Sequence, residues 1–464
     1  MKKLILFLAL LAVVSMRIAM LFRPSPLDTM SVTSEAVIVT ETAHCVRCHT
    51  KKTPGVVATW RHSNHAKAGV GCFECHGAKE GEPDARKHFG KFVSSIVSPT
   101  DCGRCHETET QQFLASHHAK GGEVLGSLDN FLGEVVEGAG ASVSGCQQCH
   151  GSKVTVMEDG TLHPATWPNF GIGRMNPDGS SGSCAACHSR HDFSVAQART
   201  PETCGRCHLG PDHPQKEIYE ESKHNIAYRS HLGAMNMDKS NWVVGVDYSA
   251  APVCATCHVS ATPNQARTHD IGNRLSWNIR AKVSFKTKDW EAKRKGMQEV
   301  CMNCHNPNYV KSFYTQYDAG IDLYNTKFAK PAQLIMKRLK EAKKADGKTP
   351  LIDATPFNEK IEWTYFFLWH HEGRRARNGL AMMGPDYVQW HGFYEIADRF
   401  YMELIPEAEH LLPAPAVGDL GGPPAITKDI LARPEHRWFR NPLSAEERRN
   451  MKTFNDRRYG TMPQ

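Results

Sequence analysis

The feature that most constrains this chain is the placement of its cysteines. All sixteen belong to eight copies of one pattern, C-x-x-C-H, and none is left over. Two thiols three positions apart can add to the two vinyl groups of a haem, and the next histidine can ligate its iron. Zinc ribbons, redox C-x-x-C sites and disulfides require no histidine after every second cysteine. The motifs are Cys45-Cys48-His49, Cys72-Cys75-His76, Cys102-Cys105-His106, Cys146-Cys149-His150, Cys184-Cys187-His188, Cys204-Cys207-His208, Cys254-Cys257-His258 and Cys301-Cys304-His305.

The spacing of the motifs predicts the fold class. Consecutive motifs start between 20 residues apart (Cys184 to Cys204) and 50 residues apart (Cys204 to Cys254), so they form no array of fixed period. Eight covalently bound c-type haems then replace much of the usual aliphatic core of residues 31–305. We expect a mainly α multihaem cytochrome whose octahaem-binding domain consists of short helices and long loops, with loops at 169–183 and 210–214.

The remainder of the chain contains no cysteine and has a helical pattern. Residues 306–412 are expected to form a C-terminal helical domain. Apolar and aromatic residues recur at helical spacing in three helices, at 309–344 with a break at Pro331, at 358–377, and at 386–412 with an interruption at Pro406. Residues 413–464 are rich in Pro, Gly and charge and are expected to form an extended surface tail.

The first residues indicate export. Lys2 and Lys3 precede an apolar run at 4–14, which predicts a signal peptide or an N-terminal membrane anchor over 1–30. The folded part is then periplasmic or in another exported compartment, either soluble or anchored by this segment. The net charge of +7 falls once haem propionates are counted, and no nucleic-acid motif is present, so no nucleic-acid partner is expected.

Seventeen histidines lie outside the motifs and can supply distal ligands to the haem irons. A Ser-x-His pattern recurs at Ser63, Ser116 and Ser222. His191 is three residues after His188, too close to reach the far side of the same haem, and is expected to ligate a neighbouring one. The distal candidates are His65, His88, His118, His191, His213, His224, His269 and His391.

Several further segments resemble the octahaem hydroxylamine oxidoreductase family over roughly residues 40–410. They are Cys184-Ala-Ala-Cys-His-Ser-Arg-His191, Gly210-Pro-Asp-His213-Pro, Thr268-His-Asp-Ile-Gly272 and Trp369-His-His-Glu-Gly-Arg-Arg375. The resemblance implies seven bis-histidine haems and one five-coordinate haem, the fourth in sequence, which holds the substrate. It also implies a small nitrogen substrate such as hydroxylamine, nitrite or a hydrazine-like compound, a homotrimer, and a cytochrome or quinone-linked redox partner.

The same resemblance suggests the residues of the substrate site. His150 would be the proximal ligand of the catalytic haem. Asp247-Tyr248 would occupy the position of the family's Asp–His pair, with His269-Asp270 as the alternative, and Tyr324 is the candidate for the distal tyrosine. Simple packing is an equally good interpretation of Asp247, Tyr248 and Tyr324.

One tyrosine bears on the direction of the reaction. Members of the family that oxidise have a tyrosine crosslinked to the catalytic haem from the neighbouring subunit, and reductive relatives lack it. Tyr387 is the best-placed candidate. Three functions follow: a hydroxylamine oxidoreductase-like enzyme, a nitrite or hydroxylamine reductase of the same fold, or a non-catalytic electron-transfer cytochrome.

Overall fold

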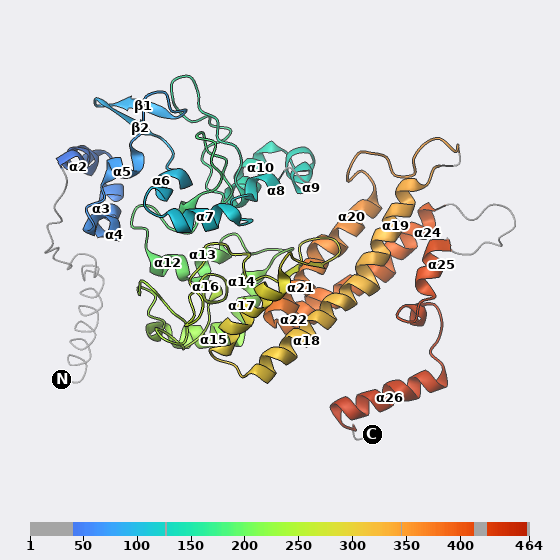
Figure 1. Cartoon of the computed structure of the whole chain (residues 1–464). Coiled ribbons are helices and arrows are strands. Elements are labelled where there is room, and N and C mark those ends of the chain that lie inside the picture. The colour runs from blue at the N-terminus through green and yellow to red at the C-terminus, as the bar shows by residue number, and fades with distance from the viewer. Residues whose placement is uncertain (1–39, 126–127, 345, 413–424, 462–464) are drawn as a thin grey trace, which may run out of the picture. The chain divides into compact units, whose positions relative to one another are not determined.

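The computed structural model describes residues 40–125, 128–344, 346–412 and 425–461 (Figure 1). The expected signal peptide or anchor at 1–30 lies outside these ranges. Among the residues that are described, no helix combines the length and the apolar character needed to cross a membrane. The described chain is mainly helical, and its named strands form two antiparallel two-stranded sheets. The predicted mainly α class is therefore confirmed.

The chain divides into two compact units, Met1–Glu74 and Cys75–Gln464. The boundary lies inside the second motif, whereas the sequence suggested boundaries at 305 and 412. In the second unit, helices of the motif segment contact the C-terminal helices directly, as α14 (Gln215–Glu221) and α21 (Gly373–Met382) do. Because of these contacts, the chain is not divided at residue 305. The elements of the first unit are α2 (Thr40–Lys52), α3 (Pro54–His62), α4 (Asn64–Lys67) and the start of α5 (Cys72–His76).

Short elements joined by long loops make up the motif segment of the second unit, as the spacing predicted. The loops at 169–183 and 210–214 contain no helix. In order, the elements are β1 (Ala85–His88), β2 (Lys91–Ser94), α6 (Pro99–Gly103), α7 (Glu107–Ala115), α8 (Gly121–Val124), α9 (Leu128–Phe131), a π turn (Leu132–Val136), α10 (Ala139–Ser144), α11 (Cys146–His150), a 3-10 turn (Cys184–Ala186), α12 (Val195–Arg199), α13 (Pro201–Gly205), α14 (Gln215–Glu221), α15 (Lys223–Ser230), a 3-10 turn (Leu232–Ala234), α16 (Cys254–His258), β3 (Trp277–Asn278), β4 (Phe285–Lys286) and α17 (Trp290–Met302).

Three long helical runs follow and lie side by side (Figure 1). Each contains at least one π turn. The first run is α18 (Pro307–Leu323), a π turn (Tyr324–Ala329) and α19 (Lys330–Glu341); the second is α20 (Lys360–Phe366), a π turn (Phe367–Glu372) and α21 (Gly373–Met382); the third is α22 (Pro385–Val388), a π turn (Gln389–Tyr394), α23 (Glu395–Asp398), a π turn (Arg399–Leu404) and α24 (Ile405–Leu411).

The prolines expected to break these runs are accommodated within them. Pro331 and Pro406 each stand in the first turn of an α-helix that directly follows a π turn. Proline has no N–H and its ring clashes with the carbonyl four residues earlier, and the wider π turn relieves that clash. The runs therefore continue through both positions.

The aromatic stripes of these helices form the largest apolar core of the second unit. Tyr324, Phe328, Phe400 and Tyr401 are buried there, in agreement with the expected helix packing. Trp390, which the same pattern placed on a packed face, is 59% exposed.

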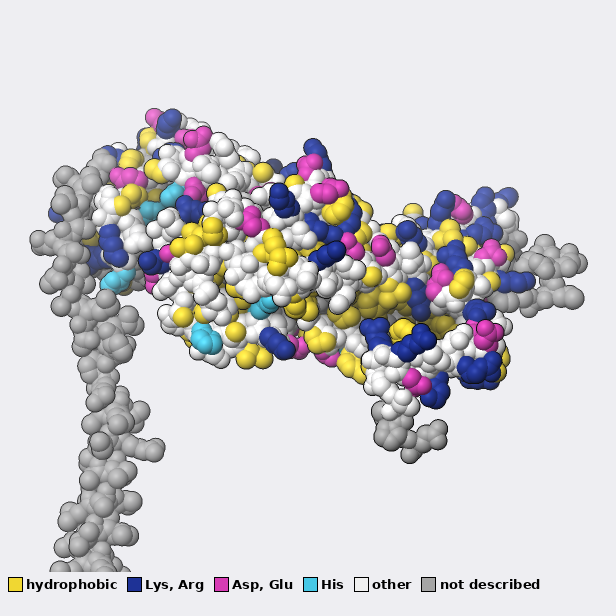
Figure 2. Space-filling view, turned by 60° about the horizontal axis from the view of Figure 1, so that its bottom comes forward, with side chains coloured by type: hydrophobic (Ala, Val, Ile, Leu, Met, Phe, Trp, Pro, Cys, Tyr) yellow, Lys and Arg dark blue, Asp and Glu magenta, His cyan; other side chains and the backbone are white. Residues whose placement is uncertain are grey.

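The predicted extended tail is partly wrong. Residues 425–431 form α25 (Ala425–Leu431), and Ile430 and Leu431 are buried in the core of the C-terminal helices. His436 is completely buried, with Nδ1 at 2.8 Å from Oη of Tyr401. A 3-10 turn (Arg437–Phe439) leads to α26 (Ala445–Tyr459), which buries no residue and displays many Lys and Arg side chains (Figure 2).

Candidate functional site

None of the sixteen motif cysteines forms a disulfide. Most motifs lie on a single helical turn, for example α5, α11 and α16. Residues three apart on such a turn share a face, so both thiols of a motif point to the same side, as attachment to one porphyrin requires. The residues therefore fit covalently bound c-type haems.

Two motif histidines face a second histidine at the separation expected of axial ligands. The ring centroids of His76 and His191 are 6.4 Å apart, and those of His305 and His224 are 6.2 Å apart. Two imidazoles that bind one metal from opposite sides, each through a bond of about 2 Å, have centroids roughly 6 Å apart. These pairs can hold the second and eighth haems, and His191 does face a motif other than its own.

The sixth motif has two facing histidines. The His208 ring lies 6.0 Å from that of His118 and 6.0 Å from that of His213. One iron takes only one of them. His118 also interacts electrostatically with His258 of the seventh motif. The arrangement is compatible with His213 at the sixth haem and His118 at the seventh.

His269 lies beside the third motif. Its backbone N–H donates to Oε1 of Gln112 on α7, at 2.8 Å. Burial lowers the pKa of His269, and repulsion from Arg267 and His106 lowers it further, so His269 and His106 lie close enough to interact. This position is compatible with the prediction that His269 is a distal ligand, here of the third haem.

The Ser-x-His repeat has a shared local structure. Ser63, Ser116 and Ser222 each end one helix in extended backbone, with φ between −70° and −79° and ψ between 154° and 161°. Each serine Oγ then accepts a backbone N–H two or three residues ahead, at 3.0 to 3.2 Å. The chain therefore turns at the serine and presents the histidine two positions later.

Three further distal candidates have different settings. His65 lies in α4 of the first unit, and His88 ends β1 at the tight turn Phe89-Gly90. His391 is exposed, and its two ring nitrogens lie 3.0 Å from Glu395 and 3.6 Å from Asp386. Both ring nitrogens of His391 thus already lie near carboxylates of its own helical run.

The fourth motif is fixed by unusually close backbone packing. The N–H groups of Ile172 and Gly173 donate to the carbonyls of Cys149 and His150, at 2.9 and 3.0 Å. Five glycines bring three segments together there, and a Cβ added at any of them would meet backbone at 1.9 to 2.9 Å. We call this set the glycine knot; its members are Gly121, Gly122, Gly151, Gly171 and Gly173.

The structure places the other candidate catalytic residues in packed surroundings. Tyr248 stacks on Trp242, and its Oη lies 2.9 Å from Oγ of Ser260. Asp247 accepts the backbone N–H of Val243, at 2.8 Å. These contacts fit a structural role for the pair.

Tyr324 and Tyr387 belong to the C-terminal helices. Tyr324 is fully buried and donates its hydroxyl to the carbonyl of Lys282, at 2.9 Å. Tyr387 is partly buried on α22, near His391, and burial raises its pKa. Neither contact involves a C-x-x-C-H motif.

One polar cluster was missed by the sequence reasoning. Arg374 donates to Asp212 at 3.0 Å and lies 2.9 Å from Nε2 of His370, which is buried. Asp212 also lies 3.4 Å from Nε2 of His213. The cluster joins the loop after the sixth motif to α21. Both segments belong to the sequence resemblance, but only a long-range contact brings them together, so their pairing was not predicted.

Cysteines of different motifs lie close enough to interact with one another. Such neighbours occur between the third and fifth motifs, the fourth and sixth, and the sixth and seventh. The pairs are Cys102 with Cys184, Cys149 with Cys207, and Cys204 with Cys254. Porphyrins attached to these cysteines would therefore be neighbours.

Two family models match the chain. One is described as "Seven times multi-haem cytochrome CxxCH" and matches residues 177–350, and the other, "Cytochrome c554 and c-prime", matches residues 25–77. Together with the paired histidines and the eight C-x-x-C-H motifs, these matches define the class: the protein is a multihaem c-type cytochrome.

One relative is named for hydroxylamine oxidoreductase, in agreement with the sequence resemblance. A probable nitrite reductase-hydroxylamine oxidoreductase fusion protein of Kuenenia stuttgartiensis is 27% identical over an alignment of 359 residues, and the match covers 64% of this chain and 37% of that protein. This chain thus spans little more than a third of that curated relative.

Solved structures show the same fold. A hypothetical multiheme protein matches with a TM-score of 0.70 at 25% identity, over 84% of this chain and 97% of that one. A reducing HAO-like protein complex of Kuenenia stuttgartiensis matches with a TM-score of 0.58 at 21% identity, over 80% of this chain and 85% of that one.

Proposed function

We propose that this chain is an exported octahaem cytochrome that transforms hydroxylamine or a related small nitrogen compound at the haem of the fourth motif. Seven bis-histidine haems would carry the electrons. The similarity to a protein named for both nitrite reductase and hydroxylamine oxidoreductase carries this proposal. The facing pairs at His76 and His305 support the bis-histidine part.

The packing of the fourth motif suits a catalytic position. When bound, its haem would supply an iron that binds nitrogen ligands and exchanges single electrons. The backbone hydrogen bonds and the glycine knot hold His150 in one place, so a ligand on the opposite side would meet a fixed iron position. The interaction between Cys149 and Cys207 indicates that the sixth motif is a neighbour to which this haem would pass electrons.

The polar groups around the sixth motif are candidates for proton handling. Reactions of hydroxylamine and nitrite move protons as well as electrons, and imidazole and carboxyl groups are the usual carriers. Asp212 and His370, bridged by Arg374, offer such groups, and the guanidinium also provides positive charge for an anionic substrate. We therefore add the cluster to Asp247, Tyr248 and Tyr324 as a candidate for this role.

The direction of the reaction, oxidation or reduction, is a separate part of the proposal. The likeness in fold to a complex described as reducing favours the reductive alternative, a nitrite or hydroxylamine reductase. Oxidation would instead be expected if Tyr387 of a neighbouring copy crosslinks to the fourth haem in a homotrimer. A cytochrome or quinone-linked protein is the partner expected to take or supply the electrons.

The test combines mass, spectroscopy and turnover on the purified holoprotein. We expect an intact mass with eight haems, one high-spin ferric signal, and either hydroxylamine oxidation or nitrite reduction. His150→Ala should abolish turnover and leave the low-spin signals intact, whereas His163→Ala, at an exposed histidine, should change neither. A purely low-spin spectrum, or full activity in His150→Ala, would contradict the proposal.

A further inference from the structure

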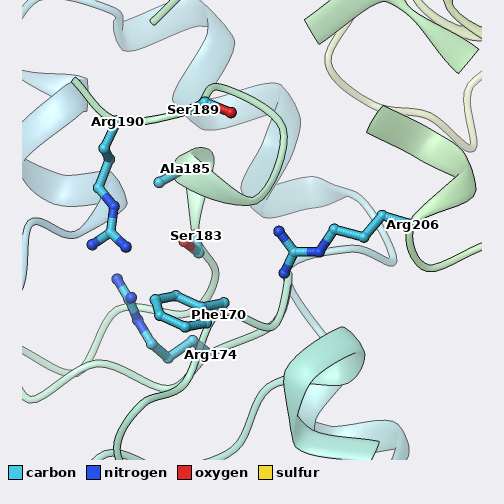
Figure 3. Close-up of a pocket in the computed structure, with 7 residues that line it drawn as sticks. All are labelled: Phe170, Arg174, Ser183, Ala185, Ser189, Arg190 and Arg206. Atoms are coloured by element: carbon cyan, nitrogen blue, oxygen red, sulfur yellow. The ribbon is translucent and has the colours of Figure 1, made fainter. Parts of the chain in front are cut away.

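A cavity of about 270 Å³ lies beside the fifth and sixth motifs, and its wall is rich in arginine (Figure 3). Arg174, Arg190 and Arg206 line it together with Phe170 and the hydroxyls of Ser183 and Ser189. Ser183 and Ser189 flank the fifth motif, and Arg206 stands between the two cysteines of the sixth. The site is therefore built into the haem-binding part of the chain.

The three guanidinium groups converge without a carboxylate between them. Figure 3 shows Arg174 and Arg190 pointing toward each other across the cavity, with Arg206 reaching in from the opposite side. Burial, together with repulsion from Arg190, lowers the pKa of Arg174 to about 10. Like charges facing one another in a partly buried cavity destabilise it unless an anion lies among them.

The acidic residues nearest to Arg174 are committed elsewhere. Asp84 accepts the backbone N–H of Ile96 at 2.9 Å, and Asp178 accepts the hydroxyl of Ser98 at 2.6 Å. Neither lines the cavity. An anion bound in this cavity would therefore be a ligand or a cofactor group, not a protein carboxylate.

Arg174 is held so that it cannot swing away. Its Nε donates to Oδ1 of Asn176 at 2.7 Å, and one terminal nitrogen donates to the carbonyl of Val97 at 3.1 Å. Arg190 stacks over Phe170, with its guanidinium carbon 5.4 Å from the ring centroid. Two guanidinium groups are thus positioned before any ligand arrives, and a planar two-oxygen anion suits them because guanidinium binds such groups in a bidentate manner.

We propose that Arg174, Arg190 and Arg206 form a binding site for a two-oxygen anion, occupied by a propionate of the haem that His76 and His191 ligate. The fifth and sixth motifs present their cysteines near this cavity, and cysteines attach at the edge of the porphyrin opposite its propionates. The haem of the second motif is the better candidate, because Arg190 of the cavity directly precedes His191, which faces the motif histidine His76. A free anion of the same shape, such as nitrite, is the other source with this chemistry.

The test replaces one arginine and measures haem potentials. Positive charge beside a haem favours its reduced form, so Arg190→Gln should lower the midpoint potential of one low-spin haem in a spectroscopic redox titration. Arg190→Lys, which keeps the charge, should lower it less. Arg449→Gln on the exposed helix α26 is the control and should leave all potentials unchanged. Intact mass must show the same haem content in every variant.

A second arm distinguishes the two sources of anion. Nitrite is added to the oxidised holoprotein, and binding is followed by spectral change and thermal stabilisation. Potentials unchanged in Arg190→Gln, with nitrite binding that requires Arg190, would support the anion site and assign it to free anion. Potentials and nitrite binding both unaffected by Arg190→Gln would overturn the proposal.

Discussion

The glycine knot behind the fourth motif gives the sharpest prediction. A Cβ placed on Gly173 would lie 2.3 Å from the backbone N of Gly121 and 2.4 Å from that of Gly122. Ordinary contact begins near 3.4 Å, so the two segments must separate by about 1 Å, which a backbone held on both sides resists. Overpacking of this kind costs about 1–3 kcal/mol, and weakening the hydrogen bond to His150 adds about 1 kcal/mol. We expect Gly173→Ala to destabilise the protein by about 2–4 kcal/mol.

Gly140→Ala is the matched control. Gly140 lies in helix α10, close to the same motif in sequence, and an added Cβ there meets nothing within 4 Å. Alanine in a helix interior is favoured over glycine by up to about 1 kcal/mol, so this variant should be neutral or slightly stabilised. Denaturant unfolding compares the variants, and EPR of the ferric holoprotein reports the high-spin signal. Equal stability of Gly173→Ala and Gly140→Ala, with identical high-spin signals, would refute the close-packing argument.

Three further outcomes test other parts of the molecule. His191→Ala should add a second five-coordinate high-spin haem to the EPR spectrum, whereas His163→Ala should not; an unaltered spectrum would show that His191 is no ligand. Arg377→Lys should lower stability by about 2–4 kcal/mol in thermal unfolding, because the fully buried guanidinium donates to four acceptors that one ammonium cannot span, and wild-type stability would contradict this. Burial lowers the pKa of His436 to about 4 from 6.5, so the unfolded chain binds more protons between these values and stability should fall by up to about 3 kcal/mol as the pH drops from 6.5 to 4. His436→Gln should flatten that dependence, and an equally steep curve in the variant would exclude this origin.

The features that sequence predicted well are those that depend on near neighbours in the chain. The C-x-x-C-H motifs form helical turns because their spacing is local, and the Ser-x-His repeat gives the same turn at Ser63, Ser116 and Ser222 for the same reason. The three C-terminal helical runs follow from the 3.6-residue period of their apolar residues.

Features set by distant contacts were harder to predict. His118 and His213 both face His208 because separate loops meet there. No rule on sequence spacing predicts which of the two ligates the sixth haem. His436 belongs to the segment 413–464, which was expected to form an extended surface tail, yet this histidine is completely buried and contacts Tyr401. Pro331 was expected to break a helix. The π turn that accommodates this proline has no simple signature in the sequence.

The neighbouring cysteines of different motifs give the protein the connectivity of a branched circuit. Cysteines of the sixth motif interact with the fourth through Cys207, with the seventh through Cys204, and with Cys187 of the fifth. Among these interactions, the sixth motif is the one node that three branches share. The third motif interacts with the fifth through Cys102, so loss of its haem would remove one terminus and leave the fourth connected to the rest. Loss of the sixth would strand the fourth, so the tolerance of this protein to the loss of a single haem should depend on the position of that haem in the circuit.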